Sequence, residues 1–436
     1  MLAPTLTRLN ATAMVAGTII GASIFVQPSE IARHLDTPAQ VMVVWTACGV
    51  LTLFGALVCA ELASAFPQTG GFYVFMRDTF SPLAGFLWGW AMFWSMHSGI
   101  IAAIAVVFAR YTAFFVPAGE AGVRTLAVAI ILALSAVNYA GVRAGSRVQT
   151  ALTIAKVAAI VLMVAIGLLA SGESRPAELT TTLGATGGAS FRDFLLAMVA
   201  GLFAYGGWHM VTYTAGETKM PARTIPLALL VGVAVVTACY VALNLVYLRI
   251  LPIEAVRSST RVAADAADAV VGRGGSVMLA ALVMVSSAGA LTGIILTGPR
   301  VYYSMAHDGL APAWLGYAHP RYRTPSHAIA AQAIWASVLA ATGAYRQLFT
   351  RVIYTEWLFF ALMAAGLFVL RRRPGYAPGY RTWGYPVVPA VFIAASLAIV
   401  ANQVVTDPRE AAAGLALVAI GAPVYYWRHH AHRRLP

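Results

Sequence analysis

Long apolar segments separated by short polar connections follow one another along the whole chain. A helix needs about 20 consecutive apolar residues to cross the hydrocarbon core of a bilayer. Glycine, proline and charged residues divide the chain into segments of roughly that length. We therefore predict twelve transmembrane helices, at residues 9–33, 39–66, 82–116, 123–140, 147–170, 191–216, 225–250, 275–304, 326–343, 349–370, 385–405 and 408–427.

The predicted connections are too short to form a soluble domain. The longest runs from Leu251 to Gly274 and could hold a short surface helix. The chain is therefore predicted to be an all-α polytopic membrane protein, with a single transmembrane domain over residues 1–436.

The composition agrees with a membrane protein, because 60% of the 436 residues are hydrophobic and 10% are charged. A soluble domain carries about 25% charged residues, which excludes an ordinary soluble enzyme. Cys48, Cys59 and Cys239 lie in apolar segments, where sulfur packs as a small hydrophobe. They provide no metal-ligand spacing, so we predict neither a metal site nor another cofactor.

The formal charge of +13 would suggest a nucleic-acid partner in a soluble protein. Here all but one of the 29 Lys and Arg residues lie at or near the ends of predicted helices, where they mark orientation. Basic clusters at 371–373 and 428–434 follow spans 10 and 12, and such clusters stay on the cytoplasmic side. We predict a multi-pass protein of the plasma (inner) membrane with both termini cytoplasmic and no nucleic-acid partner.

Two predicted spans contain glycines at mid-depth, Gly17 and Gly21 in span 1 and Gly206 and Gly207 in span 6. Glycine weakens a helix by about 1 kcal/mol relative to alanine. Non-helical backbone persists at membrane depth only where it lines a polar cavity. Breaks five helices apart are typical of an inverted repeat and of the substrate site of a secondary transporter. The alternative is that these glycines allow close helix crossing.

Four ordered motifs then indicate a family. Residues 17–26 (GTIIGASIFV) resemble the first-span signature of the amino acid-polyamine-organocation (APC) superfamily, and residues 203–208 resemble that of its L-type amino acid transporter branch. Residues 216–226 are similar to the branch's G-E-x-x-x-P-x-R-x-I-P loop, and residues 60–73 to the A-E-L…P-x-x-G-G-x-Y run. The resemblance covers nearly the whole chain.

The resemblance implies five helices at 9–170, their inverted copy at 191–370, and two additional helices at 385–427. It also implies an amino acid bound between the unwound parts of spans 1 and 6. There the start of the second half of span 1 offers N–H groups and a partial positive charge to a carboxylate. The implied substrate-binding residues are Ile19, Gly21, Ala22, Ser23, Phe203, Ala204, Tyr205 and Gly206.

Within this set, the carboxylate would lie against the backbone of residues 21–23, and the ammonium against the carbonyls of Ile19, Phe203 and Gly206. Phe203 would also act as an aromatic gate, with ordinary packing as the alternative. The family pattern G-S-G is replaced by Gly21-Ala22-Ser23. That departure could change the carboxylate geometry and the substrate size.

Lys156 is the single basic residue predicted deep in the membrane, about 15 Å from the cytoplasmic end of span 5. A charge at that depth is costly unless it is paired or faces a wet cavity. In sodium-independent members of the family, a lysine at the matching place stands where sodium-coupled relatives bind the ion. The resemblance therefore implies that Lys156 replaces sodium, with Ser286 and Ser287 as candidate partners. A purely structural lysine is the alternative.

Glu356, His97 and Trp208 are candidate pocket or proton sites. Glu356 could bind a cationic substrate or carry a proton, or it could be a structural hydrogen-bond partner. His97, like His209 after Trp208, could titrate near neutrality, but a lone membrane histidine is more often a packing residue. Trp208 could shape the pocket or pack in the core.

These features favour an amino acid permease working without sodium, as an antiporter, a proton-linked carrier or a facilitative carrier. A polyamine or cationic amino acid permease is the alternative, with Glu356 as its one good pocket acid. An intramembrane enzyme or a channel is disfavoured, because hydrolase motifs and repeated pore loops are missing from the sequence. We predict no covalent heavy-chain partner, because residues 116–122 contain no cysteine.

Overall fold

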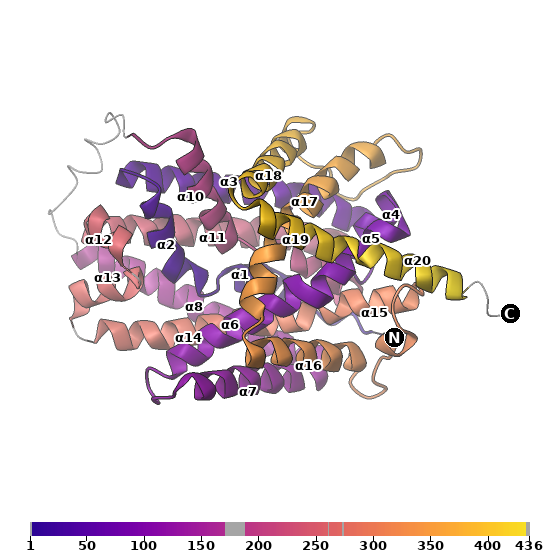
Figure 1. Cartoon of the computed structure of the whole chain (residues 1–436), viewed down its shortest axis with the longest axis horizontal. Helices are drawn as coiled ribbons and strands as arrows, with labels where there is room; N and C mark the ends of the chain where they lie inside the picture. The colour runs from indigo at the N-terminus through magenta and orange to yellow at the C-terminus, as the bar shows by residue number, and fades with distance from the viewer. Residues whose placement is uncertain (1, 171–187, 260, 273, 433–436) are drawn as a thin grey trace.

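The computed structural model describes residues 2–170, 188–259, 261–272 and 274–432, and the regular structure in those ranges is helical apart from one isolated bridge between Leu6 and Thr218. The helices lie side by side along the longest axis, with α1 near the centre (Figure 1). The start of the chain and helix α20 lie at the same end of this bundle. We call that end the terminal side.

The long helices follow the predicted apolar segments. Their bounds are α1 Arg8–Ile19, α2 Ser23–Arg33, α3 Pro38–Ala65, α5 Pro82–Ala91, α6 His97–Thr112, α7 Glu120–Tyr139, α8 Val142–Ala170, α10 Phe191–Ala204, α11 Pro221–Ile250, α14 Gly275–Thr297, α15 Pro299–His307, α16 Ser326–Thr342, α17 Tyr345–Leu370, α18 Val387–Thr406, α19 Pro408–Ala419 and α20 Gly421–His432. The shorter elements are α4 Phe72–Thr79, η1 Met92–Met96, η2 Trp208–Glu217, α12 Ile253–Ser258, α13 Val262–Val271 and η3 Ala313–Gly316.

Within the described residues, 9 helices are long and apolar enough to cross a membrane, and the bent pair α1 and α2 makes 10. The chain is therefore a multi-pass integral membrane protein. Helix α16 and the apolar part of α17, Tyr354–Leu370, are shorter. The connection from Leu251 to Gly274 holds two short helices, α12 and α13, and Arg433 and Arg434 of the last basic cluster lie outside the described residues.

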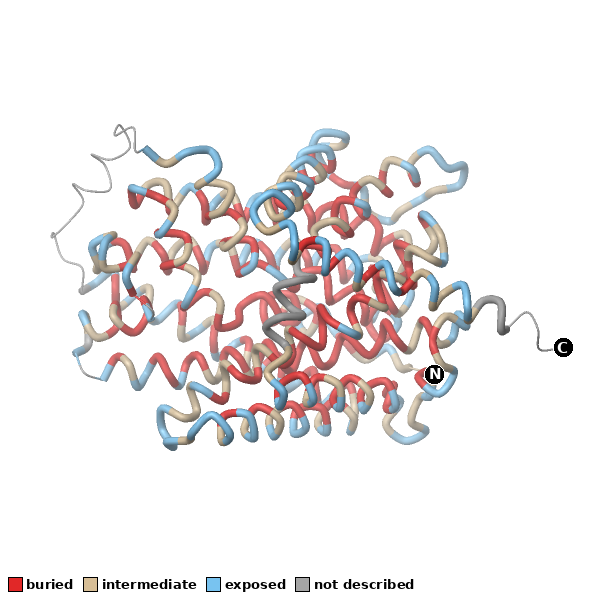
Figure 2. Tube along the Cα trace, viewed as in Figure 1, coloured by how far each residue is buried: buried red, intermediate tan, exposed pale blue. Residues whose placement is uncertain are grey.

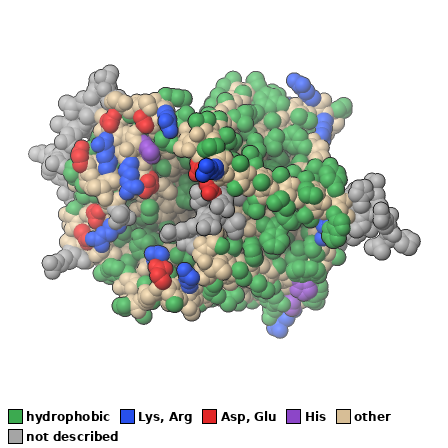
Figure 3. Space-filling view, viewed as in Figure 1, with side chains coloured by type: hydrophobic (Ala, Val, Ile, Leu, Met, Phe, Trp, Pro, Cys, Tyr) green, Lys and Arg blue, Asp and Glu red, His purple; other side chains and the backbone are tan. Residues whose placement is uncertain are grey.

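The bundle has an inner and an outer set of helices. In the most apolar window of α14 and α15, 78% of residues are buried, against 28% in α7 and 22% in α8. Buried residues accordingly follow the central helices in Figure 2, and exposed ones the periphery. Hydrophobic side chains cover much of the visible surface, with charges gathered mainly towards its ends (Figure 3). This apolar outer surface suits a lipid environment.

Both predicted helix breaks are present. Helix α1 ends at Ile19 and α2 begins at Ser23, with 44° between their axes. Helix α10 ends at Ala204, and the 3₁₀ helix η2 begins at Trp208. Between them Gly207 has φ of +98°, a left-handed conformation that glycine adopts without steric cost. A third irregularity, the π-helical turn η1 in span 3, was not predicted.

A fully buried ion pair holds the terminal side of span 6 in place. The Arg300 guanidinium donates to both carboxylate oxygens of Glu217, at 2.7 and 3.1 Å, and both side chains are at most 1% exposed. The backbone carbonyl of Glu217 accepts hydrogen bonds from the N–H groups of Thr5 and Leu6, at 2.8 and 2.9 Å. The N-terminal segment, η2 and α15 are therefore fixed to one another.

Replacing Glu217 by alanine should destabilise the protein strongly, because it leaves the Arg300 charge buried without its partner. Removing one member of a buried pair costs about 3–5 kcal/mol. The measurement is the melting temperature of the purified protein in detergent, with Glu30→Ala as the control. Glu30 pairs with Arg33 at the surface, with 43% and 46% exposure, and such a pair contributes less than about 1 kcal/mol. Equal melting temperatures for the two variants would refute the role of this pair.

Candidate functional site

The two helix breaks line a common cavity of about 300 Å³. Residues from seven predicted spans (1, 2, 3, 6, 8, 10 and 11) form its wall, and span 3 contributes the part of α6 that follows the π-helical turn. Those that the sequence predicted for the site are Ile19, Gly21, Ala22, Ser23, Phe203, Gly206, Trp208 and Glu356. The size is at the lower end of the range usual for small-molecule sites, about 300–1,000 Å³.

The first break offers a place for a carboxylate. Helix α2 begins at Ser23 with Ala22 as its N-cap, and the first N–H groups of a helix have no acceptor within that helix. Gly21, Ala22 and Ser23 all line the cavity. The N–H groups and the positive end of the α2 dipole are therefore available at the cavity wall to bind an anion.

Carbonyl groups of both breaks lie at the same cavity. The carbonyl oxygen of Ile19 accepts a hydrogen bond from the Tyr240 hydroxyl at 3.0 Å, and that of Phe203 accepts one from the Gly206 N–H at 3.2 Å. Each carbonyl has a second lone pair, so it could also accept from an ammonium group. The Phe203 side chain is 39% exposed, as expected of a ring at the cavity wall.

Two residues predicted for substrate binding lie behind the wall, since Ala204 and Tyr205 are not among the described residues that line the cavity. The Ala204 carbonyl accepts a hydrogen bond from the Tyr240 hydroxyl at 3.1 Å. The Tyr205 hydroxyl donates to the Trp45 carbonyl at 3.2 Å, which directs this ring towards α3. Both residues support the second break from outside the cavity.

Lys156 of α8 reaches the first break from behind. Its side chain is fully buried, and Nζ donates to the carbonyl oxygens of Gly17 at 2.8 Å, Ile20 at 2.5 Å and Ser286 at 3.3 Å. A helix break leaves carbonyls without intrahelical donors. The ammonium supplies such donors, and it ties spans 1, 5 and 8 together at one point.

The two serines predicted beside Lys156 differ in their contacts. The Ser286 hydroxyl lies 3.2 Å from the Ile20 carbonyl oxygen and 3.1 Å from that of Gly21, so it supports the same break. The Ser287 hydroxyl is buried and finds no hydrogen-bond partner among the described residues. Only Ser286 therefore contacts both Lys156 and span 1.

Two residues that connect the helix breaks, Thr18 and Tyr240, were not predicted as site residues from the sequence. The Thr18 hydroxyl lies 3.2 Å from the carbonyl oxygen of Gly207, and a Cβ at Gly207 would stand 3.3 Å from the Thr18 carbonyl oxygen. Tyr240 of α11 contacts the carbonyls of Ile19 and Ala204 at the two breaks. A tyrosine in the middle of an apolar helix was the available signal, but its partners depend on tertiary packing.

The three candidate pocket or proton residues occupy different positions. Glu356 and Trp208 line the cavity, and Glu356 Oε1 lies 3.6 Å from Nε2 of His209. His97 lies outside the wall, with its Nε2 2.9 Å from the Ile294 carbonyl oxygen. His97 is therefore packed outside the cavity, whereas Glu356 is placed to contact a ligand in it.

Part of the cavity extends from the two helix breaks away from the terminal side. Val26 and Gln27 of α2 and Val199 of α10 form part of its wall. Val26 is 38% exposed. These residues place part of the cavity wall on helix segments of the side opposite the termini.

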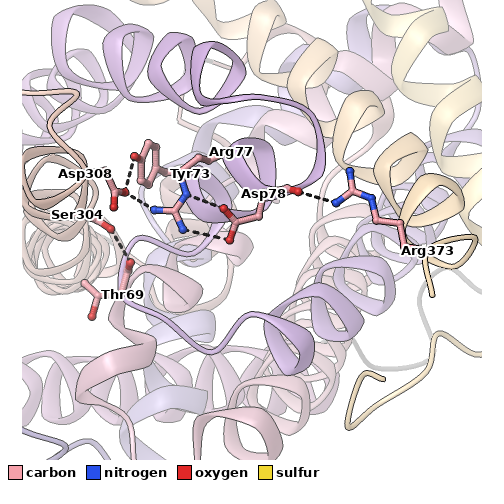
Figure 4. Close-up of polar contacts among 7 residues, drawn as sticks. All are labelled: Thr69, Tyr73, Arg77, Asp78, Ser304, Asp308 and Arg373. Atoms are coloured by element: carbon pink, nitrogen blue, oxygen red, sulfur yellow. Dashed lines mark hydrogen bonds and ion pairs between the residues drawn. The ribbon is translucent and has the colours of Figure 1, made fainter. Parts of the chain in front are cut away.

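On the terminal side, a cluster of polar contacts joins α4 to the end of α15 (Figure 4). Arg77 bonds to the carboxylates of Asp78 and Asp308, and the Tyr73 hydroxyl donates to Asp308 at 2.7 Å. The hydrogen bond to Asp78 raises the pKa of Arg77 above its usual range, against the opposing effect of partial burial, so the cation persists at all ordinary pH values. We call this cluster the terminal clasp; its residues are Thr69, Tyr73, Arg77, Asp78, Ser304, Asp308 and Arg373.

The clasp extends in both directions from Arg77. The Ser304 hydroxyl donates to the Thr69 carbonyl at 2.9 Å. Arg373 donates to the carbonyls of Asp78 and Thr79, at 2.8 and 2.6 Å. These contacts connect three segments of the terminal side that are distant in sequence.

The chain is similar in sequence to known amino acid transporters. Residues 6–424 match the family model for amino acid permeases. The serine/threonine exchanger SteT of Bacillus subtilis (strain 168) is 29% identical over 96% of this chain and 95% of its own length. The human b(0,+)-type amino acid transporter 1 is 31% identical, covering 92% and 82%. The large neutral amino acids transporter small subunit 2 of Mus musculus is 29% identical, covering 97% and 81%.

These matches confirm the resemblance found in the four motifs, and they identify a transporter family rather than an enzyme family. The family model covers almost the whole chain, including both helix breaks and Lys156. The chain belongs to the amino acid permease family of the APC superfamily.

Proposed function

We propose that this permease is a sodium-independent amino acid exchanger that works by alternating access. The substrate carboxylate binds the backbone of residues 21–23, and the ammonium binds the carbonyls of Ile19, Phe203 and Gly206. The proposal is supported by the cavity that these residues line and by the exchanger and transporter names of the relatives.

In this proposal the helices form twelve spans, with an inverted repeat of residues 9–170 in residues 191–370 and two additional helices. Both termini face the cytoplasm, so the observed cavity opens to the outside of the plasma membrane. The chain works without a covalent heavy chain. One relative is named as a small subunit, so activity of the purified chain alone is the direct test of that last point.

The environment of Lys156 is the observation that carries sodium independence. Its Nζ is surrounded by three carbonyl oxygens within 3.3 Å, and hard cations such as sodium prefer oxygen ligands of this kind. A tethered ammonium therefore supplies the positive charge and the contacts that a bound ion would otherwise provide.

Sodium should not stimulate transport. Purified protein in liposomes loaded with unlabelled serine should take up labelled serine at rates within twofold in sodium and in potassium buffers, because Lys156 already occupies the carbonyl cluster. A panel of amino acids and diamines extends the assay and measures the substrate range. Stimulation by sodium of fivefold or more would contradict the proposed role of Lys156.

Replacing Lys156 by methionine should lower the exchange rate at least tenfold. The variant keeps an unbranched side chain but removes the ammonium donor. The Gly17 carbonyl then loses its hydrogen bond from Lys156, and the Ile20 carbonyl keeps only the one from Ser286. An unsatisfied buried group costs about 1–3 kcal/mol. Lys219→Met is the matched control, because Lys219 is the other lysine of the chain and is exposed. Wild-type exchange by a well-folded Lys156→Met protein would refute the proposal.

Alternating access requires the terminal clasp to open when the outer side closes. Replacing Asp308 by asparagine removes the carboxylate that pairs with Arg77, so it should favour the state closed to the outside. A cysteine at Val26 reports this change, because Val26 lines the cavity and Cys48, Cys59 and Cys239 are all buried.

The Asp308→Asn change should reduce labelling of Val26→Cys by an impermeant maleimide applied from outside by at least threefold. Glu120→Gln, which alters an exposed pair with Arg110, should leave labelling unchanged. If Asp308→Asn also leaves it unchanged, the clasp does not hold the outward-open state.

A further inference from the structure

Glu356 is the only Asp, Glu, Lys, Arg or His among the described residues that line the cavity. Its carboxyl group belongs to α17, and the residue is 8% exposed. The same cavity includes the backbone of residues 21–23, where the proposed function places the substrate carboxylate. A substrate held there by its α-carboxylate and ammonium can direct its side chain towards Glu356.

The charge of Glu356 is coupled to a second ionisable group. Nε2 of His209 lies 3.6 Å from Glu356 Oε1, and His209 is 1% exposed. Nδ1 of His209 has no hydrogen-bond partner among the described residues. The rings packed around the imidazole are those of Phe72, Trp88, Trp208, Tyr213 and Phe360.

The other titratable groups near the pair supply no compensating charge. Tyr213 on η2 interacts with Glu356 and also faces Tyr302 and Cys59, and His97 on α6 interacts with His209. Phenol and thiol groups are uncharged in their ordinary protonation state. His97 is satisfied by the Ile294 carbonyl. A charge on Glu356 or His209 is therefore compensated by the other member of the pair or is not compensated at all.

The number of protons on the pair decides its net charge. With one proton, the pair is neutral overall, either as carboxylate with imidazolium or as carboxylic acid with neutral imidazole. With no proton it carries a buried charge of −1, and with two it carries +1. A buried charge without a partner is costly, so the empty cavity favours the state with one proton. Interacting groups of this kind titrate as a unit.

A cationic substrate side chain changes this balance. Beside Glu356, a guanidinium or ammonium group compensates the carboxylate from the cavity side, and the unprotonated pair then gives a neutral site. The proton leaves to the water of the cavity as the cation arrives, so charge and protons balance. A neutral side chain offers no compensation, and the proton stays.

We propose that Glu356 and His209 form a proton-binding pair that exchanges one proton for the cationic side chain of a basic amino acid. The site would then accept neutral and basic amino acids with the same net charge on the loaded cavity. This inference rests on the proposed substrate site and names the substrate class that the site admits.

Arginine and its uncharged isostere citrulline test the proposal. Calorimetric titrations of the purified protein at one pH, in buffers of different ionisation enthalpy, give the number of protons released per bound ligand. We expect about one for arginine and none for citrulline. Below the midpoint of the pair's titration, arginine affinity should fall tenfold per pH unit, because one proton competes with one cation.

Two variants separate the members of the pair. Glu356→Gln should lower the affinity for arginine at least tenfold relative to that for citrulline, and arginine binding should release no proton. His209→Phe keeps a ring in the aromatic cage but removes one proton acceptor, so the midpoint for arginine binding should move to lower pH. Glu120→Gln, an exposed acid outside the cavity, should change neither result.

Arginine binding without proton release, failure of arginine to bind where neutral amino acids do, or an unchanged midpoint in His209→Phe would overturn the exchange. In those cases neutral amino acids would still bind, and the proposed transport function would stand. If no amino acid of a full panel binds, the substrate site itself is wrong and the exchange fails with it.

Discussion

The hydrogen bonds between the Lys156 ammonium and the carbonyls of Gly17 and Ile20 are the interaction on which the site depends. A membrane helix can be interrupted only if the freed backbone groups find other partners, because the bilayer core offers no water. Lys156 provides such partners from span 5, and Ser286 adds another from span 8. Without these donors, the carbonyls of the unwound part of span 1 would be buried without hydrogen bonds, and the break would be unstable.

The rest of the cavity follows from that break. Thr18 connects span 1 to the second break at Gly207, whose left-handed backbone lets the two segments approach closely. Tyr240 bonds to carbonyls at both breaks from α11. A cavity with N–H groups on one wall and carbonyls on another therefore arises from a few side chains that lie behind it. Glu356 then adds the one Asp, Glu, Lys, Arg or His side chain among the described residues that line the cavity.

Much of this architecture could be predicted from the sequence, because apolar length and glycine placement act locally. The positions of the long helices, the two breaks and the place of Lys156 inside an apolar helix all depend on residues close together in the chain. The π-helical turn η1, the hydrogen bond from Tyr205 to Trp45 and the contact between His209 and Glu356 could not be predicted in the same way. Each depends on which faces of distant helices meet, and no periodicity of a single segment specifies that.

The account would be tested most directly by a cryo-electron microscopy structure of the protein with a bound amino acid in sodium-free buffer. We predict ligand density between the two breaks, with the carboxylate about 3 Å from N–H groups of residues 21–23. Lys156 should keep its contacts with Gly17 and Ile20 in that complex. Ligand density outside this cavity, or a Lys156 side chain withdrawn from both carbonyls, would contradict the account.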